Sequence, residues 1–152
     1  MELKYQSTKT FGHELGLSAC FRQWRAHDSH CSKLHGYALS FMITFEATAL
    51  DERNWVVDFG GLKTLRGYIE QTFDHKLLVA EDDPALETIK ALQTAGIADV
   101  VVMPALGCEM YARMVFEVAE IWLRDAGYGD RCRVVRVECR EHGANSAICL
   151  EA

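Results

Sequence analysis

The chain lacks the segments by which proteins enter or cross a membrane. No apolar run approaches the roughly 20 residues that a membrane-spanning helix needs, and the N-terminal segment MELKYQSTKT has no apolar core typical of a signal peptide. The six cysteines are spread along the chain without a Cys-x-x-Cys pair, as is typical of a reducing compartment. These absences predict a cytoplasmic protein without a membrane partner.

The chain also has fewer basic than acidic residues. Lys and Arg number 16 against 22 Asp and Glu, and the net charge of -6 argues against general binding of nucleic acid. The segment FRQWRAHDSHCSK is a local exception, because Arg22, Arg25 and Lys33 lie close together in it. Two interpretations remain open for this segment: a site for an anionic group, or the charges of a solvated loop.

The length of the chain fits a single domain over residues 1–152. A chain of this size can bury roughly two thirds of the surface that its unfolded form exposes, so its core does not depend on disulfides. No internal repeat, linker or low-complexity tract divides the sequence. We therefore expect one domain with one core.

Alternating apolar and polar residues indicate strands in the first third of the chain. The alternation is loose in KTFGHELGLSACFRQ (residues 9–23) and clear in YALSFMITFEATAL (residues 37–50). LDERN then supplies turn residues before the short apolar segment WVVDF (residues 55–59). We expect two long antiparallel strands followed by a short extended piece.

Two segments carry the apolar spacing of amphipathic helices. The first begins after Asp58, whose carboxylate favours a helix N-terminus, and ends near Asp74. The second spans CEMYARMVFEVAEIWLRDAGYG, with Gly127 at its C-terminal cap. Its predicted apolar stripe consists of Tyr111, Met114, Val118, Ile121 and Trp122.

The remaining segments complete an α+β pattern. Residues 81–97 are polar with helical character, residues 99–106 indicate a short strand that ends at Pro104, and residues 131–150 indicate a strand, a turn and a strand. Strands at both ends with helices between them predict an antiparallel sheet with its helices on one face. The open edges of such a sheet favour oligomerisation by strand pairing.

Cys31 is the first candidate for chemistry. It lies in HDSHCSKLH, where His27, His30 and His35 flank it within the basic segment. Imidazoles and cationic groups favour the thiolate, the form that a nucleophile or a base requires. The residues alone leave open whether Cys31 is activated or is a small loop residue among solvated histidines.

Two carboxylates are further candidates. Asp74 can orient the imidazole of His75, although neighbouring side chains usually point apart. Glu141 precedes a turn and could accept paired hydrogen bonds from an amidine-like group, as an aminopyrimidine ring presents, or could be an ordinary surface glutamate.

A metal site is the third possibility. Catalytic zinc uses three protein ligands and favours imidazole nitrogens. His35 is the central candidate, with His30 close by in sequence and His13 within reach if its strand pairs with the strand that starts at His35. None of these spacings is a specific motif, so ligand and non-ligand interpretations both stand.

Five short motifs occur in a fixed order along nearly the whole chain: CSKLHGY, VVDFGGLK, FDHKLL, CEMYA and EHGANSAIC. Together they resemble the 6-pyruvoyltetrahydropterin synthase and 6-carboxytetrahydropterin synthase family. Members of that family typically show Cys-x-x-x-His-Gly-His, V-x-D-F-x-x-L-K, L-D-H-x-x-L, P-T-x-E-x-x-A and a terminal E-T segment. Each motif is short, but five in order are far more specific than any one of them.

The resemblance implies the tunnelling fold, an antiparallel sheet of four strands with two helices on one side, assembled into a homotrimer or homohexamer. The implied reaction converts dihydroneopterin triphosphate to 6-carboxytetrahydropterin, on the route to 7-deazaguanines such as queuosine, or eliminates triphosphate in the pyruvoyl branch. By the same resemblance, Cys31 is the catalytic base, Asp74 and His75 form a catalytic pair, and Glu141 grips the pterin ring. The family's zinc ion binds the side-chain oxygens of the substrate.

The sequence departs from the family at the zinc ligands. Tyr37 stands where the second histidine of His-x-His is usual. The family's first zinc histidine lies in an F-x-A-x-H-R-L segment, for which two alignments compete. LSACFR places Phe21 at the ligand position and matches the residues better, whereas KTFGHEL places His13 there and keeps the chemistry.

Two further departures lie outside the zinc ligands. Gly107 and Cys108 replace the Pro-Thr before Glu109, and His142 stands where threonine is usual.

Three functions follow as hypotheses. The preferred one is a 6-carboxytetrahydropterin-synthase-like lyase with a rebuilt zinc site, because Cys31, Asp74, His75 and Glu141 occur together. The second is a zinc-depleted pterin-binding relative that runs an aldolase-like or epimerase-like step with Tyr37 and His75 as acid and base. The third is a binding or assembly subunit without catalytic activity.

Overall fold

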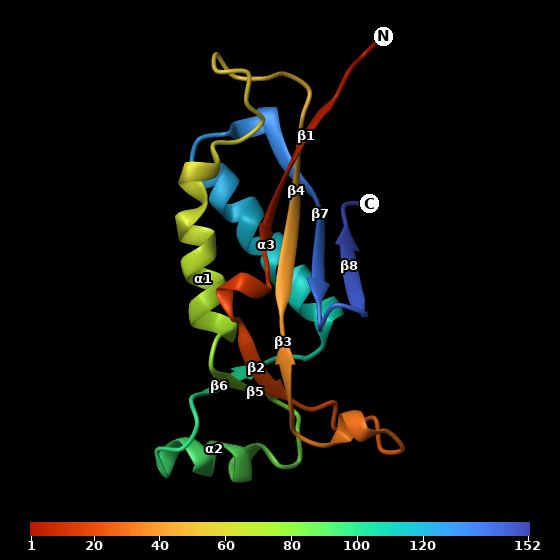
Figure 1. The fold of residues 1–152 in the computed structure, drawn as a ribbon, viewed down its shortest axis with the longest axis vertical. Helices are drawn as coiled ribbons and strands as arrows, with labels where there is room; N and C mark the ends of the chain where they lie inside the picture. The colour runs from red at the N-terminus through yellow and green to blue at the C-terminus, as the bar shows by residue number, and fades with distance from the viewer.

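The computed structural model describes residues 1–152 and contains two four-stranded sheets. The main sheet has the strand order β1-β4-β7-β8 and is antiparallel throughout, and the second has the order β3-β2-β5-β6. Figure 1 shows the main sheet along the long axis of the molecule, with the second sheet and α2 at one end. The strands are β1 (Tyr5–Phe11), β2 (Ser18–Phe21), β3 (His35–Ala38), β4 (Ser40–Ala47), β5 (Lys76–Ala80), β6 (Val100–Met103), β7 (Cys132–Arg140) and β8 (Ser146–Leu150).

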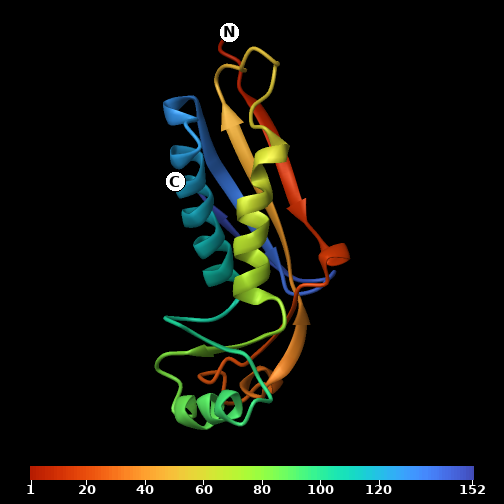
Figure 2. The same cartoon turned by 90° about the vertical axis from the view of Figure 1, so that its left-hand side faces the viewer.

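Two long helices cover one face of the main sheet, as Figure 2 shows. The predicted four-stranded antiparallel sheet with two helices on one face is therefore confirmed. The α-helices are α1 (Lys63–Phe73), α2 (Leu86–Thr94) and α3 (Cys108–Asp125), and the 3₁₀ helices are η1 (His13–Leu15), η2 (His30–Ser32), η3 (Phe59–Leu62) and η4 (Gly129–Arg131).

Alternation along β4 builds the core between this sheet and its helices. Phe41, Ile43 and Phe45 are at most 1% exposed, because every second side chain of a strand points to the same face. The Phe41 ring lies 5.1 Å from that of Phe73 on α1, and the Phe45 ring lies 6.2 Å from that of Trp122 on α3.

The helices begin near the predicted residues, but the buried stripe of α3 differs from the prediction. Asp58 caps η3 by accepting a hydrogen bond from the Gly60 amide at 2.9 Å, and α1 follows directly. In α3, Ile121 is 46% exposed, so the predicted stripe was wrong at that residue. The fully buried face consists of Cys108, Tyr111, Ala112, Val115, Ala119 and Leu123.

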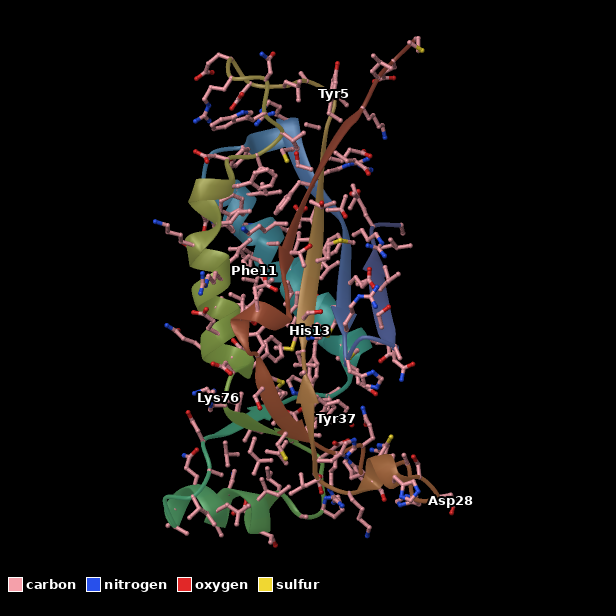
Figure 3. The ribbon with its side chains drawn as sticks, in the orientation of Figure 1. Tyr5, Phe11, His13, Asp28, Tyr37 and Lys76 are labelled. Atoms are coloured by element: carbon pink, nitrogen blue, oxygen red, sulfur yellow. The ribbon has the colours of Figure 1, made fainter.

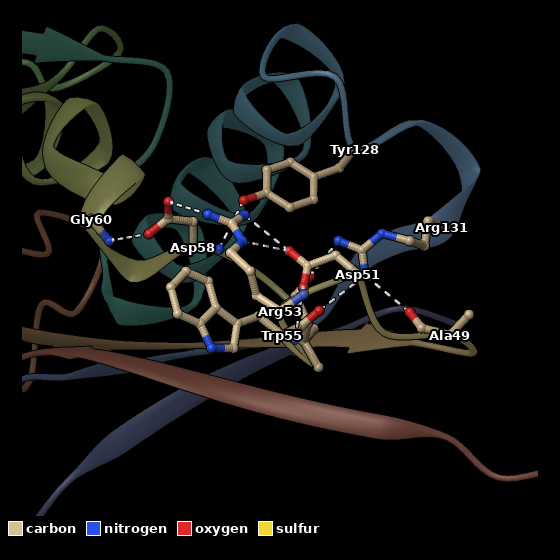
Figure 4. Close-up of polar contacts among 9 residues, drawn as sticks. Ala49, Asp51, Arg53, Trp55, Asp58, Gly60, Tyr128 and Arg131 are labelled. Atoms are coloured by element: carbon tan, nitrogen blue, oxygen red, sulfur yellow. Dashed lines mark hydrogen bonds and ion pairs between the residues drawn. The ribbon is translucent and has the colours of Figure 1, made fainter.

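The segment WVVDF was expected to be extended, but before η3 it is a loop that side-chain hydrogen bonds hold in place. The Arg131 guanidinium donates to the carbonyl oxygens of Ala49, Trp55 and Val56, and Asp51 accepts from the Trp55 amide at 2.9 Å (Figure 4). These partners take the place of a strand ladder, because buried backbone groups need hydrogen bonds of some kind.

Both expected long strands are broken in two. Residues 9–23 form β1 and β2 with η1 between them, and residues 37–50 form β3 and β4, which belong to different sheets. The β5 strand was not predicted, and its pairing with β2 and β6 is parallel. The second sheet is therefore mixed, and its strands β2 and β3 carry Phe21 and Tyr37, which line the candidate site.

Candidate functional site

A cavity of about 190 Å³ lies where β2 and β3 meet the N-terminus of α3 and the β7–β8 turn. Cys31 and Glu141, two of the predicted site residues, both line it. So do Tyr37, Phe21 and Glu109. With Cys108, which also lines it, the cavity combines two thiols, two carboxylates and two aromatic rings.

Three side chains stand at the place that the family resemblance gives to zinc ligands. Phe21 lies opposite His35 in the β2–β3 ladder, and Tyr37 is two residues further along the same face. The Phe21 and Tyr37 rings stack at 3.9 Å with an interplanar angle of 11°, and the His35 ring lies 4.5 Å from Tyr37. The geometry thus matches the alignment that places Phe21, rather than His13, beside His35.

This cluster does not fit a zinc ion. A phenyl ring offers no lone pair, and the rings meet face to face, whereas zinc needs donor atoms about 2.0–2.3 Å from one point. The predicted ligands His13, His30 and His35 are not brought together, since no group of three or more His, Cys, Asp or Glu side chains is placed to hold a metal. Figure 3 shows His13 just after β1 and Tyr37 on β3.

One ring nitrogen of His35 has a hydrogen-bond partner within the chain. Its Nδ1 donates to the Lys33 carbonyl oxygen at 2.7 Å, so Nε2 is the nitrogen left to contact other groups. Burial raises the pKa of Tyr37 to about 12, and the neighbouring Cys31 and Glu141 add to the rise. The Tyr37 hydroxyl is therefore a neutral hydrogen-bonding group near the thiol and the carboxylate.

The predicted Asp74 and His75 pair is formed. His75 Nδ1 lies 2.8 Å from Asp74 Oδ1, and the same oxygen accepts a hydrogen bond from the Ser18 amide at 3.1 Å. The pairing of adjacent residues depends on the backbone of His75, whose φ of 57° lies in the left-handed region. Asp74 therefore orients an imidazole whose side chain is 83% exposed.

Within one copy of the chain, Cys31 and the Asp74 and His75 pair lie at different cavities. His75 lines a second cavity of about 380 Å³, together with Cys20 and Gly36. These two residues alternate with Phe21 and Tyr37 along β2 and β3, so the two cavities lie on opposite faces of the hairpin. The catalytic roles of Cys31, Asp74 and His75 stay predictions.

Most of the basic charge near Cys31 is neutralised within the chain. Arg22 binds Asp83 through two hydrogen bonds at 2.6 and 2.9 Å, and the Asp83 side chain is 1% exposed. The guanidinium of Arg22 lowers the pKa of Asp83 below its usual range. Arg25 pairs with Asp82 at 2.9 Å. Two of the arginines of this segment therefore form ion pairs that stabilise the fold. The predicted role of the segment as an anion site stays a prediction.

Sequence reasoning missed several cavity residues. Glu109 lies in the first turn of α3, and Gln23 follows β2 and donates to the Leu106 carbonyl oxygen at 2.6 Å. Gly107 permits this approach, because a Cβ there would lie 2.9 Å from Gln23 Nε2 and its φ is 118°. The unusual Gly107 in place of proline was the available signal. The other missed residues that line the cavity are Cys108, Asn145, Ser146 and Ala147.

The comparisons with known proteins agree with this architecture. A family model described as 6-pyruvoyl tetrahydropterin synthase matches residues 12–152. A 6-carboxy-5,6,7,8-tetrahydropterin synthase of Aquifex aeolicus (strain VF5) is 25% identical over 163 residues, covering 95% of this chain and 97% of the relative.

Solved structures share the fold at lower identity. An uncharacterised protein of Wolinella succinogenes superposes with a TM-score of 0.80 at 19% identity, covering 99% of both chains. The 6-pyruvoyl tetrahydropterin synthase of Plasmodium falciparum gives a TM-score of 0.70 at 12% identity, covering 97% of this chain and 98% of that one.

No helix of the present structure has the length and apolar character needed to span a bilayer.

Proposed function

Because the chain belongs to the 6-pyruvoyl tetrahydropterin synthase family, we propose that it is a pterin-binding lyase, and more narrowly that it converts dihydroneopterin triphosphate to 6-carboxytetrahydropterin. The observation that carries the proposal is the cavity that holds Cys31, Glu109 and Glu141 together. In this proposal the product feeds the synthesis of 7-deazaguanines such as queuosine. The six free thiols suit the reducing cytoplasm.

The two carboxylates suit the ring of a pterin. An aminopyrimidine presents two parallel N–H donors, and a carboxylate accepts both in a paired geometry. Glu141 belongs to the β7–β8 turn, where its amide donates to the Asn145 carbonyl oxygen at 3.1 Å, so its backbone is fixed. Glu141 is the proposed ring anchor, and Glu109 faces the same cavity.

The thiol suits proton abstraction from the side chain of a bound pterin. Cys31 is exposed and is the middle residue of the short helix η2, where the Oγ of the N-cap residue Ser29 accepts from the Cys31 amide at 3.1 Å. A pterin ring anchored at Glu141 places its side chain in the cavity that Cys31 lines. In the proposed reaction, the thiolate form of Cys31 accepts a proton from a side-chain carbon or hydroxyl and becomes the thiol.

The active unit in this proposal is a homo-oligomer. The Asp74 and His75 pair lies on the opposite face of the hairpin from Cys31, so another copy must supply the pair to each cavity. The main sheet has two open edges, β1 and β8, through which copies can pair.

Product analysis tests the proposed function. The untagged protein is incubated with dihydroneopterin triphosphate, and the pterins are separated and identified by mass spectrometry. A product with the mass of 6-carboxytetrahydropterin is expected, and its formation should fall about 10²-fold or more in Cys31→Ala. Glu141→Gln should mainly raise KM, because the amide nitrogen of glutamine cannot accept the second ring N–H and one ring hydrogen bond is lost. Complete conversion by Cys31→Ala would contradict the proposed role of the thiol.

Tyr37 in the cavity supports a second candidate function. A phenol beside a bound dihydropterin suits an aldolase-like or epimerase-like step on the side chain. The same assay separates the candidates, since an aldolase releases a hydroxymethyl pterin and a short aldehyde, and an epimerase gives a product of unchanged mass. Ligand binding without any new pterin would favour a binding subunit over both enzymes.

A further inference from the structure

The Phe21, His35 and Tyr37 cluster occupies the position of a metal centre without the donors of one. Phe21 and Tyr37 stack face to face at 3.9 Å, and Phe21 also meets Tyr111 edge to face at 5.2 Å. Phe21 is 2% exposed and Tyr37 is 9% exposed, so the stack belongs to the packed core of the protein. Aromatic pairs of this kind stabilise one arrangement of the rings.

The position of Tyr37 gives the cluster a polar function. Tyr37 lines the cavity beside Cys31 and Glu141, and both groups act electrostatically on its hydroxyl. A phenol O–H donates one hydrogen bond, whereas the ring faces of Phe21 and Tyr37 present apolar area. The cavity thus offers a donor where a metal ion would otherwise attract an oxygen of the ligand.

We propose that this protein holds its ligand in a metal-free subsite, in which the Phe21 and Tyr37 stack fills the place of two metal-binding imidazoles and the Tyr37 hydroxyl donates a hydrogen bond to a side-chain oxygen of the ligand. The identity of the ligand as a pterin rests on the proposed function. The absence of a metal centre rests only on the side chains at positions 21, 35 and 37.

Metal analysis tests the first half of the inference. The untagged oligomer is purified from zinc-replete medium, desalted and analysed by plasma mass spectrometry. The native protein is expected to carry far less than one zinc ion per chain. The double variant Phe21→His with Tyr37→His, which joins two imidazoles to His35, is expected to gain about one zinc ion per chain. Phe21→Tyr with Tyr37→Phe changes the same residues without imidazoles and is the matched control.

The native measurement decides this half even if the double variant fails to fold. One tightly held zinc ion per native chain overturns the inference. Zinc-free native protein supports it, and zinc uptake by the double variant shows in addition that the position has the geometry of a metal site.

Ligand binding tests the second half. Neopterin fluorescence is titrated with native protein and with Tyr37→Phe, each with and without a strong chelator. The chelator is expected to leave native binding unchanged, and loss of the hydroxyl is expected to weaken it about tenfold while the ring stack and the melting temperature persist. Equal affinity of Tyr37→Phe and native protein, or loss of native binding in chelator, overturns the inference. Native protein that is zinc-free and binds no pterin contradicts the proposed function and leaves the metal result standing.

Discussion

The uncommon backbone conformation of His75 determines where its imidazole lies. A φ of 57° is uncommon for a residue other than glycine, and it turns the imidazole back toward the carboxylate of the preceding Asp74. Adjacent side chains usually diverge, so the sequence alone could suggest this hydrogen bond but could not establish it. In the proposed function, this arrangement positions the His75 imidazole for proton transfer.

Asp74→Asn tests the positioning. The amide oxygen can still accept from the Ser18 amide, so the fold is kept, but the negative charge that orients and supports the His75 imidazole is lost. We expect kcat to fall about 10²- to 10⁴-fold in the product assay, with an unchanged melting temperature.

A second variant separates the ring from the backbone. His75→Asn keeps a residue that tolerates the left-handed region and removes the imidazole, so it should be as slow as Asp74→Asn. Turnover at the native rate in both variants would remove this pair from the mechanism.

Tyr111 carries the one buried polar side-chain atom without a hydrogen-bond partner. Its ring contacts Phe21 and Phe73 edge to face at 5.2 Å, and the burial of its hydroxyl raises its pKa above the usual range. Tyr111→Phe keeps the ring contacts and removes the unpaired hydroxyl. We expect the free energy of unfolding to rise by up to about 1 kcal/mol in urea denaturation.

The matched control is Tyr111→Leu. It removes both edge-to-face contacts and should lower the free energy of unfolding by about 1–3 kcal/mol. A loss of similar size in Tyr111→Phe would mean that the hydroxyl is paired after all.

At the scale of elements, Glu46 joins the two flanks of β4. Its carboxylate accepts hydrogen bonds from Arg133 on β7 at 2.8 Å, from Gln6 on β1 at 3.0 Å, and from Lys4 at 3.1 Å. These bonds, with that of Arg133 the strongest, lower the pKa of Glu46 to about 2. The ionised carboxylate therefore ties three strands together on the face of the sheet away from the helices.

The sign of the pH effect follows from that lowered pKa. An unfolded glutamate titrates near pH 4.3, so the ionised form favours the folded state above about pH 4.3 and this contribution disappears as the pH falls toward 2. Glu46→Gln should lower the melting temperature at pH 7 and flatten its dependence on pH between about 4.3 and 2. Glu2→Gln, at an exposed residue outside this network, is the matched control. Parallel melting curves for native protein and Glu46→Gln across that range would contradict the expectation.

The elements that could be predicted are those with one buried face. The α1 and α3 helices, β4 and the β7–β8 hairpin show clear apolar periodicity, because each has a core side and an outer side. The β5 strand was missed because Leu77, Leu78, Val79 and Ala80 are all buried, which removes any alternation. The break between β3 and β4 was missed because alternation continues through Leu39 while the chain changes sheets.

The whole molecule explains which site residues could be found. Cys31 and Glu141 were recognised from local motifs, and the fold brings them into one cavity across more than 100 residues of sequence. Gln23 could not be recognised in this way, because its place depends on the meeting of the N-terminus of α3 with the end of β2. A motif reports residue types, whereas a cavity depends on contacts between distant segments.

The separation of Cys31 from His75 predicts that activity needs more than one copy. Cys31→Ala and His75→Ala are each expected to be inactive alone. When the two variants are mixed under conditions that allow subunit exchange, a cavity with one intact thiol and one intact Asp74 and His75 pair can form between copies. We expect partial recovery of turnover in the mixture, measured together with the molar mass by light scattering.

One control mixture and the molar mass of the native protein complete this test. Cys31→Ala mixed with the double variant Cys31→Ala and His75→Ala contains no thiol at Cys31 and should stay inactive. A fully active native monomer in light scattering would contradict the shared site.

The strand order of the main sheet has a consequence for how the chain is made. Strands β1, β4, β7 and β8 lie side by side in the order in which a ribosome produces them. Each new strand can therefore add to the open edge of those already emerged, and none has to be inserted between two earlier partners. Of these four strands, β8 is the last to leave the exit tunnel; it pairs with β7 and brings the β7–β8 turn with Glu141 to its place, so the ligand cavity is completed only after the other three strands have emerged.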